Sequence, residues 1–260
     1  MSDLHERLRR FWDEDARTYD RSPSHAASDP VEAAAWREIL RRHLPEPPAS
    51  VMDVGAGTGA ISLLVAELGH RVTAVDLSPG MLAHAAEKAT ERGLELTTVA
   101  APASEPPPGP FDAVVERHLL WTTPDPVAAL SAWRGVVAPG GRAVLFEGIF
   151  SRDSLPWRAR GMAANGLRRA LGVADDHHAG YDADLLDSLP LARATSPEPL
   201  IRALTEAGWR SVRLERLRDV EWARRMAAPP MLGRLEGVPQ FALVANAPAA
   251  RPTRRRRTPS

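Results

Sequence analysis

Hydrophobic residues follow two alternating periods between residues 50 and 148. Short apolar runs rich in valine and alanine are typical of buried strands, and they alternate with segments whose apolar positions recur at helical spacing. The predicted strands are 50–55, 71–77, 94–100, 110–120 and 142–148, and the predicted helices are 60–69, 78–93 and 125–141, the last ending in a turn. This alternation predicts an α/β fold in which helices cover both faces of a parallel sheet.

The segments that flank this core have a different pattern. Apolar residues at helical spacing predict helices at 4–12 and 31–44 with a loop between them, and we expect residues 1–45 to form a helical lid. Residues 151–196 are too polar and irregular for core strands, which predicts a helical insertion that caps a substrate site. The core domain is therefore expected to consist of residues 46–150 and 197–248.

The C-terminal part returns to the pattern of the core. A helix is predicted at 196–208, and strands are predicted at 209–217 and 240–247. The end of the chain, RPTRRRRTPS, holds five arginines and no apolar residue. We therefore expect residues 249–260 to form a disordered basic tail.

The run VMDVGAGTGA, residues 51–60, carries the first chemical signal. Gly55, Gly57 and Gly59 lie between a predicted strand and a predicted helix, so the backbone can approach a ligand closely and the helix directs N–H groups toward it. The G-x-G-x-G spacing differs from the G-x-G-x-x-G of dinucleotide-binding folds. Asp53, just before the loop, would repel a pyrophosphate but would suit a cationic ammonium group.

Asp76 ends the second predicted strand and adds a second signal. A carboxylate at this position can accept hydrogen bonds from ribose hydroxyls. Because NAD and S-adenosylmethionine both contain ribose, Asp76 supports nucleoside binding without deciding between the two.

Four stretches together resemble the successive motifs of class I S-adenosylmethionine-dependent methyltransferases. They are VMDVGAGTG, VTAVDLSPGMLAHA, FDAVVERHLLWTTPDP and GVVAPGGRAVLFEG, which cover roughly residues 50–150 in the family's order. The run RHLLWTTPDP resembles a variant seen in a subset of small-molecule methyltransferases. The resemblance implies a Rossmann-like, seven-stranded, mostly parallel sheet with an antiparallel last strand, which strands 209–217 and 240–247 would complete as a hairpin.

The resemblance also implies S-adenosylmethionine as the cofactor, with S-adenosylhomocysteine as its product. Asp53 and the glycine loop would hold the methionine portion, Asp76 the ribose, and Leu77 and Met81 the adenine. Tyr19 would belong to an aromatic lid, with Phe11 and Trp12, next to the sulfonium. The implied cofactor-binding residues are Asp53, Gly55, Ala56, Gly57, Gly59, Asp76, Leu77, Met81, Ala101 and Tyr19.

One position departs from the family pattern. After the third strand such proteins often have an Asp that accepts from the adenine amine, whereas this chain has Ala100 and Ala101. Ser104, Glu105 or a backbone carbonyl can take over that contact. The loss of one hydrogen bond weakens binding by about 0.5–1.5 kcal/mol without abolishing it.

Ligands of open α/β sheets lie beyond the carboxyl ends of the strands, so the residues after strand 110–120 are expected near the reacting methyl group. His118 is the candidate general base, because its pKa is naturally near the working pH; a structural histidine is the alternative. Arg117 can bind a substrate carboxylate, or it can have a surface or cofactor role. Trp121 can stack on the acceptor or pack in the core.

The insertion contains the run DDHH, residues 175–178. Adjacent side chains on an irregular segment rarely converge on one ion, so we expect no metal and favour a solvated loop. The alternative is that His177 and His178 contact the acceptor. Trp157 and Tyr181, with Arg158, are expected to shape the acceptor pocket.

Composition narrows the function classes. Lys+Arg and Asp+Glu are both 33 in 260 residues, so no net field attracts nucleic acid or an anionic membrane. The absence of cysteine excludes disulfides and thiolate metal sites. We expect no signal peptide, a cytoplasmic protein, no nucleic-acid or membrane partner, and a monomer or homodimer.

These observations predict methyl transfer from S-adenosylmethionine to nitrogen or oxygen of a small-molecule acceptor, in specialised metabolism. The alternatives are carbon methylation of a quinone-like ring and a non-catalytic binding or regulatory protein with the same fold. A nicotinamide oxidoreductase is disfavoured by the glycine spacing. A nucleic-acid or protein methyltransferase is disfavoured by the zero net charge.

Overall fold

The computed structural model describes residues 3–148, 155–173, 181 and 183–249, apart from the side chains at 23–24 and 156–158. Seven strands form one sheet in the order β3-β2-β1-β4-β5-β7-β6, in which β7 is antiparallel to both neighbours. The strands are β1 (Ser50–Val54), β2 (Arg71–Asp76), β3 (Thr97–Ala100), β4 (Phe111–Arg117), β5 (Val137–Gly148), β6 (Arg210–Arg216) and β7 (Gln240–Asn246). The predicted Rossmann-like sheet is therefore confirmed.

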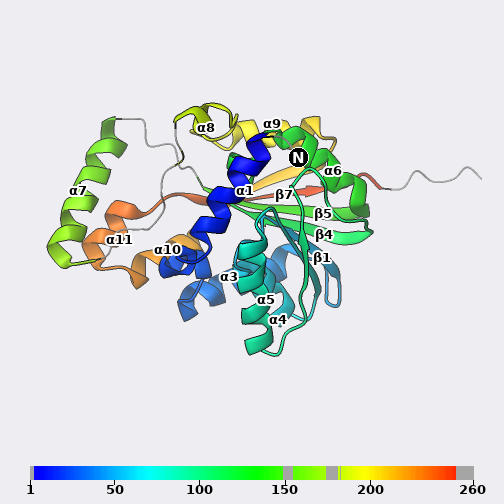
Figure 1. The fold of residues 1–260 in the computed structure, drawn as a ribbon, viewed down its shortest axis with the longest axis horizontal. Helices are drawn as coiled ribbons and strands as arrows, with labels where there is room; N and C mark the ends of the chain where they lie inside the picture. Colours follow the sequence, from blue (N-terminus) through cyan, green and yellow to red (C-terminus); the bar gives the residue numbers. More distant parts are fainter. Residues whose placement is uncertain (1–2, 149–154, 174–180, 182, 250–260) are drawn as a thin grey trace, which may run out of the picture.

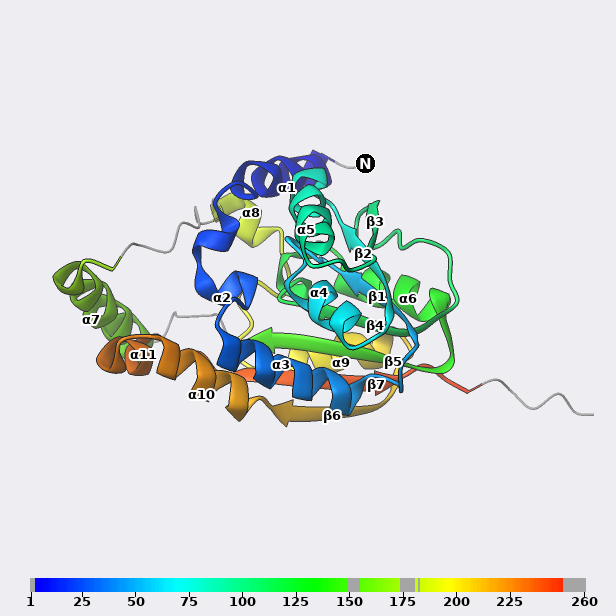
Figure 2. The same ribbon diagram turned by 90° about the horizontal axis from the view of Figure 1, so that it is seen from below.

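Helices cover both faces of this sheet (Figures 1 and 2). One face packs on α6 (Pro126–Val136) and α9 (Glu198–Glu206) through a cluster that includes the buried Trp133 and Trp209. The other face packs on α3 (Pro30–His43), α4 (Ala60–Glu67) and α10 (Arg218–Ala227) around Trp36. The helix α5 (Pro79–Glu91) lies beside β2 and β3.

The helix starts follow the local chemistry of the sequence. The Asp29 carboxylate accepts hydrogen bonds from the backbone N–H groups of Val31 and Glu32, and the Ser78 hydroxyl accepts from Met81. These side chains satisfy N–H groups that have no partner within their helices. In both helices proline follows the cap, where its fixed φ angle suits the first turn.

The strand β4 ends three residues earlier than the pattern predicts. His118 has a φ of +61°, in the left-handed region, and its backbone N–H donates to the carbonyl of Phe146 in β5. The chain then turns into the short helix η2 (Leu120–Thr122) instead of continuing the strand to residue 120. This bend directs residues 118–125 over the carboxyl ends of the strands.

The N-terminal segment is more helical than expected. The helix α1 (Asp3–Asp15) packs beside α5, and the expected loop that follows contains the short helices η1 (Tyr19–Arg21) and α2 (Pro23–Ala26). Figure 2 shows α1 lying over α5 at the edge of the molecule that carries β2 and β3.

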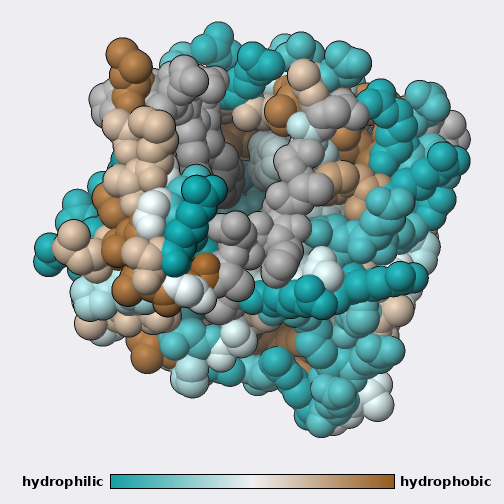
Figure 3. Space-filling view, turned by 60° about the vertical axis from the view of Figure 1, so that its left-hand side comes forward, coloured by the Kyte–Doolittle hydropathy of each residue, from teal (hydrophilic) through white to brown (hydrophobic). Residues whose placement is uncertain are grey.

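The described part of the predicted insertion is helical, with α7 (Leu155–Leu171) and α8 (Ala183–Asp187). The connection between β6 and β7, to which the sequence assigned no element, contains α10 and α11 (Pro230–Glu236). The helices α7 and α11 pack together at one end of the molecule (Figure 1). Figure 3 turns this end toward the viewer, and apolar residues gather on its left side while hydrophilic residues cover much of the rest of the face. No helix in the described part of the chain is long and apolar enough to span a membrane.

Candidate active site at the carboxyl ends of the strands

A cavity of about 950 Å³, its open mouth included, lies at the carboxyl ends of β1, β2 and β4. The lining combines strand ends, the loops that follow them and the N-terminal segment. The lining residues are His5, Leu8, Trp12, Tyr19, Val54, Gly55, Gly57, Asp76, Leu77, Met81, Ala101, Pro102, Ala103, Ser104, Arg117, His118, Leu119, Thr122, Thr123, Pro124 and Asp125.

The glycine loop forms one wall of this cavity. Gly55, Gly57 and Gly59 all have positive φ angles, which L-residues with side chains rarely adopt. A Cβ atom on Gly55 would lie 2.8 Å from the Leu119 side chain, whereas one on Gly57 would meet only Tyr19, at 3.9 Å. Gly57 therefore leaves backbone open to a ligand. Gly59 and Ala56 do not line the cavity and serve the turn itself.

Asp76 joins the glycine loop to the loop after β2. Its Oδ2 accepts from the Gly57 N–H at 2.8 Å and its Oδ1 accepts from the Ser78 N–H at 2.8 Å. Each carboxylate oxygen retains a second lone pair, and Asp76 lines the cavity. Burial raises the pKa of this carboxyl from its ordinary value. The side chain is held where a ribose diol could donate to it.

Asp53 has a different position from the one expected. It is buried below the loop, does not line the cavity, and its Oδ2 accepts from the Ser62 hydroxyl at 2.5 Å. Burial raises the pKa of Asp53 to about 7, partly offset by the Ser62 hydrogen bond. A direct contact between Asp53 and a ligand in the cavity is therefore not prepared in this structure.

The opposite wall comes from the loops after β2 and β3. Leu77, Met81 and Ala101 all line the cavity, as expected for an apolar surface next to a base. The backbone N–H of Ala101 donates to the carbonyl of Asp76, which fixes the loop that lacks the family's carboxylate. Ser104 lines the cavity and Glu105 does not, so Ser104 is the better-placed substitute for that carboxylate.

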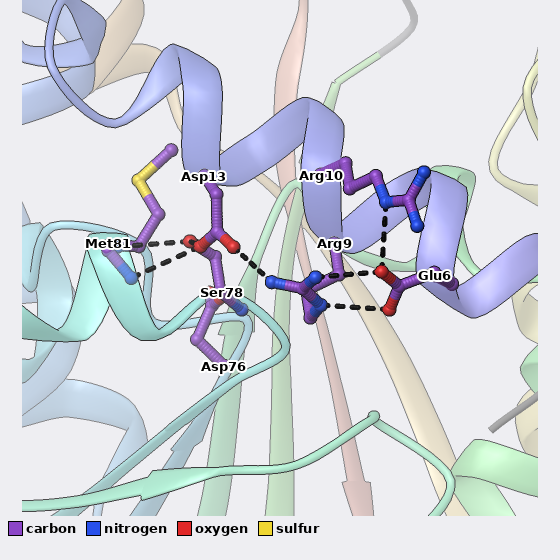
Figure 4. A network of polar contacts seen from close by, with 8 residues as sticks. Glu6, Arg9, Arg10, Asp13, Asp76, Ser78 and Met81 are labelled. Atoms are coloured by element: carbon purple, nitrogen blue, oxygen red, sulfur yellow. Dashed lines mark hydrogen bonds and ion pairs between the residues drawn. The ribbon is translucent and has the colours of Figure 1, made fainter.

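The helix α1 is fastened to the start of α5 by a polar network (Figure 4). Asp13 Oδ1 accepts from the Ser78 hydroxyl at 2.5 Å and from the Gly80 N–H at 3.2 Å, while Arg9 bridges Asp13 and Glu6. A second attachment follows in η1. Asp20 accepts from the Thr58 hydroxyl at 2.6 Å and from Lys88 Nζ at 2.8 Å.

Aromatic rings gather between the N-terminal segment and the insertion. Tyr19 lines the cavity and stacks on His25, with ring centroids 4.3 Å apart. The Tyr181 ring lies 4.6 Å from Phe11 and 5.6 Å from Trp121. Tyr181 and Trp121 are thus in contact, but Trp121 lines a smaller cavity, beside Glu147, and not the large one.

His118 lines the large cavity at the end of β4, with Arg117 beside it. Burial, together with the charges of Arg117, Arg224 and His25, holds the pKa of His118 well below its usual value. The imidazole is therefore neutral at physiological pH. Arg117 donates to the His25 carbonyl, and its guanidinium lies 5.8 Å from the Trp36 ring centroid.

Part of the predicted site lies outside the residues that the structure describes. Asp175, Asp176, His177 and His178 lie outside the described residues, as does the side chain of Trp157. In the other direction, the sequence analysis did not single out His5, Leu8, Thr122, Thr123 or Asp125 as site residues, although all of them line the cavity. The TTPDP stretch was visible as part of a motif, but only the bend at His118 directs it inward.

The arrangement fits a nucleoside cofactor. Asp76 offers acceptors to a ribose, Leu77 and Met81 offer an apolar surface to a base, and Gly57 leaves the backbone accessible. An aromatic face at Tyr19 is a favourable neighbour for a sulfonium cation.

Comparisons with known proteins agree with this geometry. Residues 52–145 match the family described as a methyltransferase domain. The ubiquinone biosynthesis O-methyltransferase of Xanthomonas campestris pv. campestris (strain B100) is 31% identical over 176 residues, which cover 66% of this chain and 69% of that protein. The corresponding protein of Xanthomonas oryzae pv. oryzae (strain PXO99A) is 30% identical over the same shares of the two chains.

Solved structures share the fold. A SAM-dependent methyltransferase from Aquifex aeolicus superposes with a TM-score of 0.56 at 15% identity and covers 87% of this chain and 98% of its own. The [4+2]-cyclase SpnF superposes with a TM-score of 0.57 at 19% identity, covering 84% and 81%. From the sequence relatives and the shared fold together, the chain belongs to the class I S-adenosylmethionine-dependent methyltransferases.

Proposed function

We propose that the chain transfers the methyl group of S-adenosylmethionine to a hydroxyl oxygen of a small-molecule acceptor. The observation that carries the proposal is a single cavity lined by the Gly57 and Asp76 loops on one side and by the neutral His118 on the other. The relatives that are named O-methyltransferases support oxygen as the acceptor atom.

S-adenosylmethionine supplies an electrophilic methyl group on a sulfonium sulfur. The chain's own contribution begins with binding. Asp76 would accept from the ribose, Leu77 and Met81 would line the adenine, and the backbone around Gly57 would face the amino-acid portion. Tyr19 and Trp12 cover the cofactor and exclude water from it. Much of the rate enhancement comes from holding an acceptor in line at near-contact distance.

A hydroxyl acceptor has to lose its proton at or before transfer, and His118 is the group proposed to take it. Its low pKa keeps one ring nitrogen unprotonated at physiological pH. Among residues 117–126, the RHLLWTTPDP stretch, seven line the cavity, and this supports its assignment to the small-molecule subset. They are Arg117, His118, Leu119, Thr122, Thr123, Pro124 and Asp125.

The acceptor is proposed to enter beside the aromatic rings of Phe11, Trp121 and Tyr181. Rings of this kind bury flat apolar molecules efficiently. In this proposal residues 1–45 act as a lid over the cofactor and residues 151–196 as the cap that selects the acceptor.

Two measurements test the proposal in sequence. Calorimetric titration is expected to show binding of S-adenosylhomocysteine in preference to NADH. Incubation with S-adenosylmethionine that carries a ¹³C methyl group, and with matched panels of phenols, amines and quinone-like rings, is then expected to label phenolic oxygen, as judged by mass spectrometry and NMR of the product. Preferential NADH binding would overturn the cofactor assignment. Label on nitrogen or ring carbon would overturn the acceptor atom.

A further inference from the structure

Two buried carboxyl groups lie directly behind the cavity. Glu116 is near the end of β4 and Glu147 near the end of β5, and both side chains are almost fully buried. Glu116 is in register with Leu145, so Glu147, two residues further along β5, points to the same face of the sheet. The two carboxyls are therefore diagonal neighbours on the face that α6 covers.

Backbone N–H groups of the bend at His118 hold both carboxyls in place. Glu116 Oε2 accepts from the Leu119 N–H at 2.9 Å, and Glu147 Oε1 accepts from the Leu120 N–H at 3.1 Å. The second oxygen of Glu147, Oε2, lies 3.7 Å from Nδ1 of His118. Nδ1 is itself buried, whereas the His118 side chain as a whole is 23% exposed and the residue lines the cavity.

We propose that Glu147 is a positioning residue that decides which nitrogen of His118 carries the ring proton. The inference rests on the proposed function, in which His118 takes the proton of the acceptor hydroxyl. The Nδ1–Oε2 distance of 3.7 Å is within ion-pair range but beyond hydrogen-bond distance, so a small shift of the two side chains is needed to form the bond. When Glu147 is ionised it then accepts from Nδ1–H, which leaves the lone pair of the ring on Nε2. When Glu147 is protonated it donates to Nδ1, and Nε2 carries a hydrogen and cannot act as a base.

The proton balance of the active form is simple. The acceptor hydroxyl loses its proton to Nε2, which leaves an imidazolium whose Nδ1–H faces the Glu147 carboxylate. The carboxylate stabilises this cation until Nε2 releases the proton to water. Without that carboxylate, the charges of Arg117, Arg224 and His25 oppose a positive charge on the His118 ring.

The protonation of the pair is set by burial. Burial and the neighbouring carboxyl raise the pKa of Glu116 well above its usual value, and Asp53 adds to the rise. Burial also raises the pKa of Glu147 to about 8, although the backbone N–H groups of Leu120, Gly148 and Trp121 oppose the rise. The base-competent tautomer of His118 is therefore expected to gain population as the pH rises through about 8.

Histidine NMR tests this inference without cofactor or acceptor. Protein labelled with ¹⁵N in its histidines is titrated from about pH 6 to about pH 10, two units on either side of the Glu147 pKa of about 8. The two ring ¹⁵N signals of His118, identified by their loss in His118→Gln, report which nitrogen is protonated. The expected result is a change from the Nε2–H to the Nδ1–H tautomer with a midpoint near pH 8.

Two amide variants separate the roles of the carboxyls. Glu147→Gln is expected to show no change of tautomer near pH 8, because an amide cannot ionise. Glu116→Gln mimics a protonated Glu116 and is expected to retain the change near pH 8. Glu147→Asp is expected to restore a pH-dependent tautomer. An unchanging tautomer in the parent, a parent-like change in Glu147→Gln, or loss of the change in Glu116→Gln would each overturn the inference.

Failure of the proposed function has a different signature. If neither the parent nor the variants bind S-adenosylhomocysteine in a calorimetric titration, the cofactor assignment is wrong. The NMR result on the His118 tautomer is independent of that outcome, because it is measured without cofactor. Glu147 does not line the large cavity, so Glu147→Gln is expected to bind S-adenosylhomocysteine as the parent does. Retained binding also shows that this variant is folded.

Discussion

Asp13 of α1 accepts a hydrogen bond from the hydroxyl of Ser78, the residue that caps α5, with 2.5 Å between Oδ1 and Oγ. Ser78 also follows directly from the Asp76 loop, and its N–H donates to the Asp76 carboxylate. One short polar segment thus connects the helix that covers the cavity with the carboxylate assigned to the ribose. Attachment of the lid and cofactor binding are expected to be coupled.

Replacing Asp13 with alanine is expected to weaken S-adenosylhomocysteine binding about tenfold, because hydrogen bonds to a charged group contribute about 1.5–3 kcal/mol and part of that holds α1 over the cofactor. Calorimetry measures the effect. Glu14→Ala, an exposed acid on the same helix, is the matched control and is expected to bind normally. Equal affinity in the two variants would show that α1 is attached independently of Asp13.

Asp76→Ala is expected to weaken S-adenosylhomocysteine binding by one to two orders of magnitude, equivalent to about 1.5–3 kcal/mol. The variant loses the ribose acceptors and also releases the Gly57 and Ser78 N–H groups. Glu105→Gln removes an exposed carboxylate that does not line the cavity, and its affinity is expected to be that of the parent. A large loss in Glu105→Gln would instead support Glu105 as the adenine contact.

Much of the fold could be predicted from the sequence, because strand and helix periods, capping residues and glycines are local signals. Asp29 and Ser78 cap their helices as their positions suggest. The helix α10 was missed because only Val220 and Ala223 are buried on its face, so it lacks the apolar stripe of the predicted helices. The early end of β4 depends on a left-handed His118 held by the Phe146 carbonyl, a contact between strands that no local pattern contains.

Gly55→Ala is expected to destabilise the protein by more than Gly93→Ala. Both glycines have φ near +65°, so both substitutions strain the backbone by about 1–2 kcal/mol. Only the new Cβ at position 55 meets another group, the Leu119 side chain at 2.8 Å, whereas the space at Gly93 is open. We therefore expect Gly55→Ala to lower the free energy of unfolding by about 1–3 kcal/mol more than Gly93→Ala does.

Denaturant unfolding of the two variants measures this difference. If the two variants lose the same free energy of unfolding, the Leu119 side chain moves aside without an energetic cost. In that case the close approach at Gly55 would not limit the loop, and the backbone angle alone would account for the glycine.

Stability is expected to fall as the pH rises from about 4.5 toward about 8. The folded Glu147 keeps its proton up to its pKa of about 8, whereas the same group in the unfolded chain releases it near 4.5. In this window the folded state binds more protons, so the free energy of unfolding decreases with pH, by at most about 1.4 kcal/mol per pH unit for each such group. Asp53, with a pKa raised to about 7, acts in the same direction.

Glu147→Gln removes one of these groups and is expected to flatten the dependence, so that the variant gains stability relative to the parent as the pH rises. Urea unfolding at pH 5 and pH 8.5 measures the slope. Glu95→Gln, an exposed acid, should leave the slope unchanged. A parallel pH dependence in Glu147→Gln and the parent would contradict the raised pKa.

The residues proposed to bind the cofactor could be grouped from the sequence. The residues proposed to act on the acceptor, around His118, could be grouped much less well. Asp76, Leu77, Met81 and the loop glycines follow one another in a single stretch, so their grouping needs only the alternation of strands and helices. Glu147 is separated from His118 by almost thirty residues, and the two meet only because β4 and β5 are neighbours. Asp53 was expected to face a ligand, but the structure directs it to Ser62 instead.

The ion pair between Lys88 and Asp20 has a practical consequence for measuring lid movement. Lys88 is the only lysine in the chain, and its amine is held 2.8 Å from a carboxylate of the N-terminal segment. Acylating reagents that select ε-amines therefore have one side-chain target, whose reactivity is suppressed while the segment is docked. The rate of modification at this one site reports how often the segment detaches, without any introduced label.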